Sequence, residues 1–363
     1  MKPLLERTSD NRPPTLRCLE YAPVVPAAVL VYDPRFVEHV SSPLHVERPE
    51  RLEAIVSRLK AEKLFTDVAT PVPAELAEVK RVHRASYVEF FRDLREGFID
   101  RETAVHPETF DIALLAAGAV LGAVRTAVRE ACPTVALVRP PGHHAGPDYG
   151  GGFCYLNSVA IAAADQIAQG HRVAILDYDG HHGNGTSEIF TDESTVLYVS
   201  THQYGIYPGT GAAEDVGTGE GRGFTVNIPF GPGCGDASYH VAFEDVIEPI
   251  VREYRPEAIL VSLGVDGHYR DPLTSLALSS PGYVDLLARS WMLARDVCGG
   301  RYAVALEGGY HLQALSEVFA GLVARLRGTR VDLELTDHLD AKGKGKPAIA
   351  ATRRAHETFW NLR

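Results

Sequence analysis

Short apolar runs alternate with longer amphipathic stretches along most of the chain. Seven runs rich in β-branched residues are continuously apolar, which is typical of strands covered on both faces. They lie at Ala27–Tyr32, Thr134–Val138, Arg172–Asp177, Thr195–Ser200, Phe224–Ile228, Ala258–Leu263 and Tyr302–Leu306. Helical periodicity predicts helices over Glu50–Glu62, Thr109–Arg129, Asn157–Gln169, Ser238–Glu253, Gly282–Val297 and Gln313–Leu326. This alternation predicts an α/β fold with a central, mainly parallel β-sheet flanked by helices on both faces.

The two ends of the chain differ from its middle. We expect residues 1–24, rich in proline and charge, to form an irregular lead-in, residues 25–330 to form the main domain, and residues 331–363 to form an extension that packs on it. The extension carries Lys342, Lys344 and Lys346 in the stretch KGKGK. We expect a solvated loop there before a last helix, with Trp360 against the domain; a nucleic-acid or histone contact is the alternative.

Composition narrows the class of protein. The 363 residues are 45% hydrophobic and 23% charged, which excludes a disordered chain, a coiled coil and a collagen-like repeat. A net charge of −11 repels phosphates on average, so we expect no nucleic-acid partner. The longest apolar run, Ile112 to Val124, is shorter than the ~20 residues that span a bilayer, so we expect no membrane span. Five scattered cysteines without C-x-x-C and charges near the N-terminus favour a reduced, cytoplasmic protein, which could form a homo-oligomer.

Four polar or glycine-rich clusters each follow a predicted strand. They are RPPGHHA at 139–145, running on into GGGFCYLN at 150–157; LDYDGHHGNGT at 176–186; GVDGHYRDPL at 264–273; and EGGY at 307–310. Because ligands of open parallel sheets bind beyond the carboxyl ends of the strands, we expect these clusters to form one site.

The residue types in these clusters point to metal-assisted hydrolysis of an acyl bond. Asp179, His181 and Asp266 supply three oxygen and nitrogen ligands, the catalytic pattern for zinc that leaves a position open for water. Adjacent imidazoles, His143 and His144, could move the proton, and the phenol of Tyr310 could stabilise an oxyanion. Taken alone, the DxDxH segment could instead be a polar turn, and Asp266 a helix cap.

The ordered motifs RPPGHHA, GFCYLN, DYDGHHGNG, GVDGHYRDP and EGGY, with HVERPERL at 45–52 upstream, resemble the zinc-dependent histone deacetylase and acetylpolyamine amidohydrolase superfamily. The likeness is to its class II-like, bacterial branch and covers roughly residues 27–330. It implies the single-domain arginase/deacetylase-like fold, one Zn²⁺ per chain and a structural K⁺.

The resemblance also implies roles for individual side chains. The zinc ligands match Asp179, His181 and Asp266. The general base and later acid matches His144, and its partner matches His143. The groups that orient these imidazoles match Asp177 and Asn184, and the residue that polarises the acyl carbonyl matches Tyr310. Asn184 stands where an Asp is the other common choice, as in the class II branch.

Further positions match the substrate channel and the potassium site. The channel residues are Phe153 and Tyr207 as aromatic walls, Gly152 at the narrow part, Leu273 at a position that selects substrates, and Glu102 at the rim; the potassium positions are Asp177, Asp179, His181, Ser200 and Thr201. Arg48 is our prediction for the arginine of a product-release pocket.

We therefore expect a deacetylase that removes acetyl or other small acyl groups from acyl-lysine in a peptide or protein. An acetylpolyamine or another small N-acyl-amine is the alternative substrate; Leu273, where some polyamine-selective relatives carry Glu, weighs against it. Two remote alternatives are a binuclear manganese ureohydrolase, which Gly264 disfavours by removing a ligand for a second metal, and a non-catalytic acyl-lysine binder. The complete acid, base and phenol set disfavours the binder.

Overall fold

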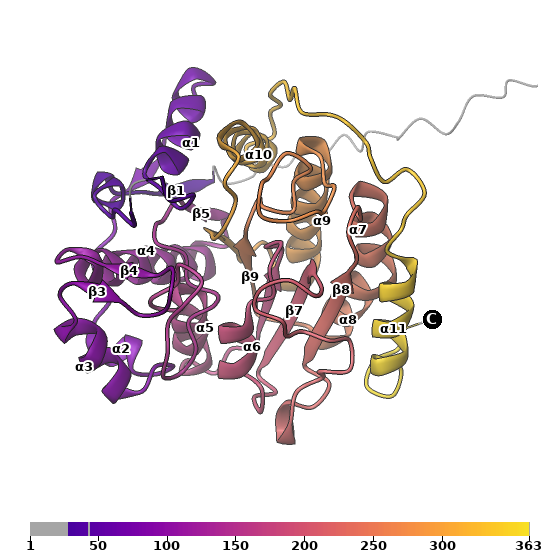
Figure 1. Ribbon diagram of the computed structural model, residues 1–363. Helices are drawn as coiled ribbons and strands as arrows, with labels where there is room; N and C mark the ends of the chain where they lie inside the picture. Colours follow the sequence, from indigo (N-terminus) through magenta and orange to yellow (C-terminus); the bar gives the residue numbers. More distant parts are fainter. Residues whose placement is uncertain (1–27, 43, 363) are drawn as a thin grey trace, which may run out of the picture.

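Eight parallel strands form the central sheet of the computed structural model, which describes residues 28–42 and 44–362 (Figure 1). Their order across the sheet is β2-β1-β5-β10-β9-β6-β7-β8, and every pairing is parallel. The strands are β1 (Val29–Val31), β2 (Val68–Ala69), β5 (Thr134–Ala136), β6 (Val173–Asp177), β7 (Val196–Gln203), β8 (Thr225–Phe230), β9 (Ala258–Leu263) and β10 (Tyr302–Leu306).

The middle of the sheet is buried on both faces. Every residue of β5, β6, β9 and β10 is buried, so both pleat directions need apolar side chains and the sequence shows no alternation. The predicted strands and the predicted fold class are therefore confirmed; among the described strands of the central sheet, only β2, too short for a pattern, was missed. Ala27, the first residue of the first predicted strand, lies outside the described residues.

Helices cover the two faces. The helices α4 (Thr109–Glu130) and α5 (Ser158–Ile167) pack on one face, while α1 (Glu50–Ala61), α9 (Ser280–Cys298) and α10 (Leu312–Leu326) pack on the other (Figure 1). Of the described helices, α4 has the length and apolar composition to cross a membrane, and 67% of its most apolar window is buried inside the fold. That burial is typical of a core helix, as predicted for the apolar run within it.

The helix predicted over Ser238–Glu253 is divided in the structure. It consists of α7 (Asp236–Ala242), a π-helical turn η3 (Phe243–Ile247) and α8 (Glu248–Tyr254). Proline occupies the first turn of α8 and has no N–H to donate to the preceding turn, which accounts for the wider π turn before it.

Other short elements escaped the sequence patterns. They are the 3-10 turns η1 (Pro34–Val37) and η2 (Gly219–Gly221), the helices α2 (Leu76–Val79), α3 (Ala85–Asp93) and α6 (Asn184–Ile189), and the hairpin of β3 (Gly97–Phe98) and β4 (Ala104–Val105). Most are shorter than the window over which periodicity is measurable.

The C-terminal segment lies along the edge of the sheet. The helix α11 (Lys346–His356) packs against β8, the last strand (Figure 1). The indole Nε1 of Trp360 donates to the carbonyl of Gly223 at 2.8 Å, and its ring contacts Phe224 edge-on at 5.4 Å. The buried carboxylate of Asp340 accepts from backbone N–H groups of Gly235 and Lys344, both at 2.9 Å. These contacts attach the segment to the domain.

Two glycines one turn apart on α4 provide a test of its close packing. A Cβ on Gly118 would lie 1.9 Å from the carbonyl oxygen of Val72, whereas a Cβ on Gly122 would meet nothing within 4 Å. We expect Gly118→Ala to lower the free energy of unfolding by about 1–3 kcal/mol through overpacking. Gly122→Ala should raise it by about 0.5–1 kcal/mol, the difference in helix propensity. Chemical denaturation of both variants measures this, and equal effects would contradict the packing described.

Candidate active site

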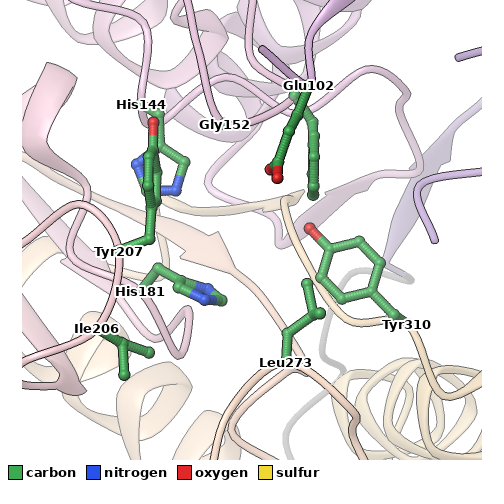
Figure 2. A pocket seen from close by; sticks show the side chains of 9 residues that line it. Glu102, His144, Gly152, His181, Ile206, Tyr207, Leu273 and Tyr310 are labelled. Carbon is green, nitrogen blue, oxygen red and sulfur yellow. The ribbon is translucent and has the colours of Figure 1, made fainter. Parts of the chain in front are cut away.

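The four polar clusters meet in one pocket at the carboxyl edge of the sheet. They follow β5, β6, β9 and β10, which are neighbours in the order β5-β10-β9-β6, so their loops emerge side by side. The pocket has a volume of about 230 Å³ and is lined by Glu102, His144, Gly152, Phe153, His181, Ile206, Tyr207, Leu273 and Tyr310 (Figure 2). All five predicted channel residues, two of the predicted catalytic residues and one predicted metal ligand therefore line the same cavity.

Three predicted metal ligands converge beneath this pocket. Ligand atoms of Asp179, His181 and Asp266 all lie within 4.8 Å of one another. The Nδ1 of His181 lies 2.6 Å from Oδ2 of Asp266 and 3.3 Å from Oδ1 of Asp179. The two carboxylates are buried. A preoriented set of two carboxylates and one imidazole fits a divalent ion such as zinc, with room for further ligands.

Glycines make this crowding possible. A Cβ on Gly264 would lie 1.8 Å from Oδ2 of Asp179, and one on Gly308 would lie 2.6 Å from the same atom. The N–H of Gly308 donates to that oxygen at 2.8 Å. Only glycine at these two positions lets the loops after β9 and β10 approach the carboxylate this closely.

The surroundings of His143 favour the charged form of its imidazole. Its Nδ1 lies 3.2 Å from Oδ2 of Asp177, and its Nε2 lies 3.7 Å from Oδ1 of Asp179. Burial opposes the charged form, but the carboxylates of Asp179 and Asp177 outweigh it and raise the pKa of His143 to about 10. A divalent cation on Asp179 would offset part of this attraction.

His144 is in the opposite situation. Burial, followed by the positive charges of His143 and His181, holds the pKa of His144 well below its ordinary value. Its Nδ1 lies 2.7 Å from Oδ1 of Asn184, and its ring centroid is 4.0 Å from that of His143. Two neighbouring imidazoles with pKa values pushed apart are typical of separate roles in proton transfer.

Tyr310 faces the imidazoles from the loop after β10. Figure 2 shows its phenol oxygen and the carboxylate of Glu102 both turned toward the interior of the pocket. The guanidinium of Arg51 lies over the phenol ring at 5.0 Å, and the backbone N–H of Tyr310 donates to Oδ2 of Asp271 at 2.6 Å. Burial raises the pKa of Tyr310 well above its usual value, so the phenol remains a hydrogen-bond donor.

The aromatic walls leave a narrow passage. Phe153 adopts the left-handed φ of 69°, held by a hydrogen bond from its N–H to Oγ1 of Thr103 at 3.0 Å. A Cβ on Gly152 would lie 2.7 Å from Cδ2 of His144 and 2.8 Å from Cε1 of Tyr207. The passage is therefore narrow at Gly152, where even a Cβ would clash with its walls.

The predicted potassium positions also lie together. Asp177 pairs with Ser200 in the register of β6 and β7, and the hydroxyl of Thr201 donates to the carbonyl of Asp177 at 3.4 Å. Asp179 and His181 follow within the same loop. The structure brings these five positions to one corner of the sheet.

The prediction for Arg48 is wrong. Its side chain is exposed and lies 4.0 Å from Glu50, because it precedes α1 on the solvent side. The buried arginine of this motif is Arg51, on the inner face of α1. Arg51 Nε donates to the carbonyl of Gly309 and Nη2 to that of Glu307, both at 2.6 Å.

Ionic contacts behind the site were not predicted from the sequence. The fully buried carboxylate of Glu47 accepts from Arg51 Nη1 at 2.9 Å and from Arg139 at 2.5 and 2.8 Å. Burial would raise the pKa of Glu47, but the charges of Arg139 and Arg51 lower it below its usual range. Charged residues within the motifs HVERPERL and RPPGHHA were the available signal.

Glu307 was also not predicted as part of the site. Its Oε2 accepts from the backbone N–H groups of Gly142 and His143, at 2.7 and 3.1 Å. Burial raises the pKa of Glu307 to about 7. This side chain fixes the backbone that presents the two imidazoles.

Known proteins are similar to this chain in sequence and in architecture. Residues 45–326 match the histone deacetylase domain family. A probable deacetylase of Archaeoglobus fulgidus is 40% identical over 91% of this chain and 98% of its own. The human polyamine deacetylase HDAC10 is 37% identical over 78% of this chain and 45% of its own. The crystal structure of the HDA15 HD domain has a TM-score of 0.83 and 32% identity, covering 92% of this chain and 97% of that chain.

The Glu47 contacts predict a specific stability difference. Glu47→Gln removes the charge that compensates two buried guanidinium groups, so we expect it to lower the free energy of unfolding by about 3–5 kcal/mol. Glu248→Gln makes the same substitution in a partly exposed pair with Arg252 at 2.8 Å and should cost less than about 0.5 kcal/mol. Urea denaturation compares them; a Glu47 variant as stable as the Glu248 variant would refute the buried-pair interpretation.

Proposed function

The chain belongs to the histone deacetylase family, and from this premise we propose that it is a zinc-dependent deacetylase that removes acetyl or other small acyl groups from the side-chain amine of acyl-lysine. The observation that carries the proposal is the pocket itself. A narrow aromatic passage leads to an imidazole with a lowered pKa, a protonated phenol and a three-residue ligand set at one end.

Asp179, His181 and Asp266 would hold the zinc ion. When bound, zinc would polarise the acyl carbonyl and lower the pKa of a water molecule to about 7. The rest of the chemistry belongs to the side chains of the pocket.

His144 moves the proton in this proposal. Its Nδ1 is engaged by Asn184 at 2.7 Å, which leaves Nε2 to accept a proton from the attacking water and to deliver it to the leaving amine. His143 stays protonated beside Asp177, and its fixed positive charge disfavours a resting proton on His144. The Tyr310 hydroxyl donates to the carbonyl oxygen as negative charge develops there.

The walls select the substrate's shape. Phe153 and Tyr207 would lie along the methylenes of an acyl-lysine side chain, and the close approach at Gly152 would exclude branching. Leu273 adds an apolar contact at the mouth rather than a charge, which supports acyl-lysine over a polyamine. The carboxylate of Glu102, turned into the pocket (Figure 2), is the observation that favours an acylpolyamine as second candidate.

The more remote alternatives fit less well. A second metal of the ureohydrolase kind would need a carboxylate at position 264, where even a Cβ would lie 1.8 Å from Asp179 Oδ2. A binder without turnover would not need the Tyr310 phenol and the His144–Asn184 contact together. A structural potassium ion at Asp177, Asp179, His181, Ser200 and Thr201 and a cytoplasmic location remain part of the proposal.

The metal requirement is tested by measuring the zinc content and the activity of the protein before and after removal of the metal. We expect about one zinc per chain, loss of deacetylation after treatment with a strong chelator, and recovery with added zinc. Asp266→Asn should bind little zinc because it removes a ligand, whereas Asp285→Asn, on the exposed face of α9, should bind as the unaltered protein does. Two manganese ions per active chain would contradict the proposal.

Tyr310→Phe separates binding from turnover. The variant keeps the ring between Arg51 and Phe153 but loses the hydroxyl that donates in the transition state. We expect kcat to fall by about 10²-fold or more, with KM changed little, the scale of losing one oxyanion donor. An unchanged kcat would remove Tyr310 from the mechanism.

The two candidate substrate classes are distinguished by comparing their kcat/KM values directly. We expect acetyl-lysine peptides to give a higher kcat/KM than N-acetylputrescine and N-acetylspermidine. A preference above about 100-fold for the polyamines, or about 2.7 kcal/mol of transition-state binding, would reverse the assignment. Glu102→Gln should then lower kcat/KM for the polyamines selectively.

A further inference from the structure

Asn184, which contacts the proposed general base His144, can present either end of its amide to the imidazole. A carboxylate at this position would present acceptors to His144 whichever way it turned. An amide has one acceptor end and one donor end, and rotation by 180° exchanges them. If the NH₂ end faced Nδ1 of His144, the imidazole proton would move to Nε2, and the nitrogen left for catalysis could no longer accept a proton.

The other end of this amide contacts Tyr149, which in turn contacts Glu188. Nδ2 of Asn184 lies 3.0 Å from the phenol oxygen of Tyr149, and that phenol lies 2.7 Å from Oε2 of Glu188. Tyr149 belongs to the loop that follows His144, and its ring lies over Gly146, where a Cβ would be 2.3 Å from Cε1 of the ring. Glu188 is on α6, one turn after Asn184.

The carboxylate of Glu188 fixes the direction of each hydrogen bond in the series that runs from Glu188 through Tyr149 and Asn184 to His144. A carboxylate only accepts, so Tyr149 donates its single hydroxyl proton to Glu188. The phenol oxygen can then only accept from Asn184, which requires the NH₂ end of the amide. Oδ1 of Asn184 is thereby turned to His144, whose Nδ1 must donate across the 2.7 Å contact. Nε2 is left with its lone pair.

We propose that Tyr149, anchored by Glu188, is a positioning residue that fixes the orientation of the Asn184 amide and, through it, the tautomer of His144. The inference rests on the proposed deacetylase function and deepens it. Burial, reinforced by the carboxylate of Glu188, keeps the pKa of Tyr149 above its usual value, so its hydroxyl keeps the proton it donates.

The first experiment is Tyr149→Phe, assayed as zinc-loaded enzyme on an acetyl-lysine peptide. Losing the hydroxyl frees the amide to rotate, and we expect kcat to fall about 10-fold with KM within about 2-fold. Tyr204→Phe is the matched control: this tyrosine is 49% exposed, outside the pocket lining, and should leave kcat unchanged. A Tyr149 variant with the kcat of the control would overturn the proposal.

A second background separates positioning from a purely structural role. Asp at 184 accepts at both oxygens and needs no orientation, so Tyr149→Phe in an Asn184→Asp chain should lower kcat by less than about 2-fold relative to Asn184→Asp alone. An equal loss in both backgrounds would show that Tyr149 only supports the loop, and the proposal would fail.

Histidine ¹⁵N spectra test the inference without turnover. With His144→Ala used to assign the signal, the zinc-loaded protein should show the Nδ1–H form of His144, and Tyr149→Phe should shift signal toward the Nε2–H form. Absence of deacetylation by the unaltered enzyme on peptides and polyamines alike would sink the proposed function, while an unchanged His144 spectrum in Tyr149→Phe would sink this inference alone.

Discussion

Buried negative charge at the carboxyl edge of the sheet is the constraint around which the site is built. Asp177, Asp179, Asp266 and Glu307 are all 2% exposed or less, and carboxylates cannot remain ionised inside a protein without compensation. The compensation comes from imidazoles and from backbone N–H groups of glycine-rich loops, and a divalent cation on the ligand set would add to it. In the proposed mechanism these imidazoles also bind the metal or influence the proton transfer, so stability and reactivity would depend on the same contacts.

A second set of charges holds the loops in register. Glu47 joins Arg51 on α1 to Arg139 after β5, and Arg51 in turn binds the carbonyls of the loop after β10. Segments that are remote in sequence are therefore fixed by directional hydrogen bonds. Rigid placement of this kind would let the phenol and the imidazole of the proposed mechanism act without reorganising during the reaction.

Features that depend on residues close together in sequence were predicted, whereas features that depend on distant contacts were not. Continuous apolar runs located the central strands because burial on both faces leaves a mark in every residue. The motif residues of the pocket were found because they follow those strands. The helix start at Glu50 was predicted, but Arg48 was still the wrong arginine, because the burial of Arg51 depends on the carbonyls of Glu307 and Gly309, which are remote in sequence.

Other features depend on contacts that no local pattern encodes. Glu307 was passed over beside Tyr310 because its partners, the N–H groups of Gly142 and His143, lie 165 and 164 positions earlier. The contact of Tyr149 with Glu188 joins a loop to α6 through side chains alone. Elements such as α6 carry too few residues to show a period.

The helix laid along β8 limits how copies of this protein can associate. Many dimers form by continuing one sheet across a two-fold axis, which needs an open strand with free backbone groups at its border. Here α11 occupies that border on one side, and on the other the last strand is only Val68–Ala69. These two borders favour a homodimer that assembles through helices or loops, with each subunit keeping a self-contained sheet.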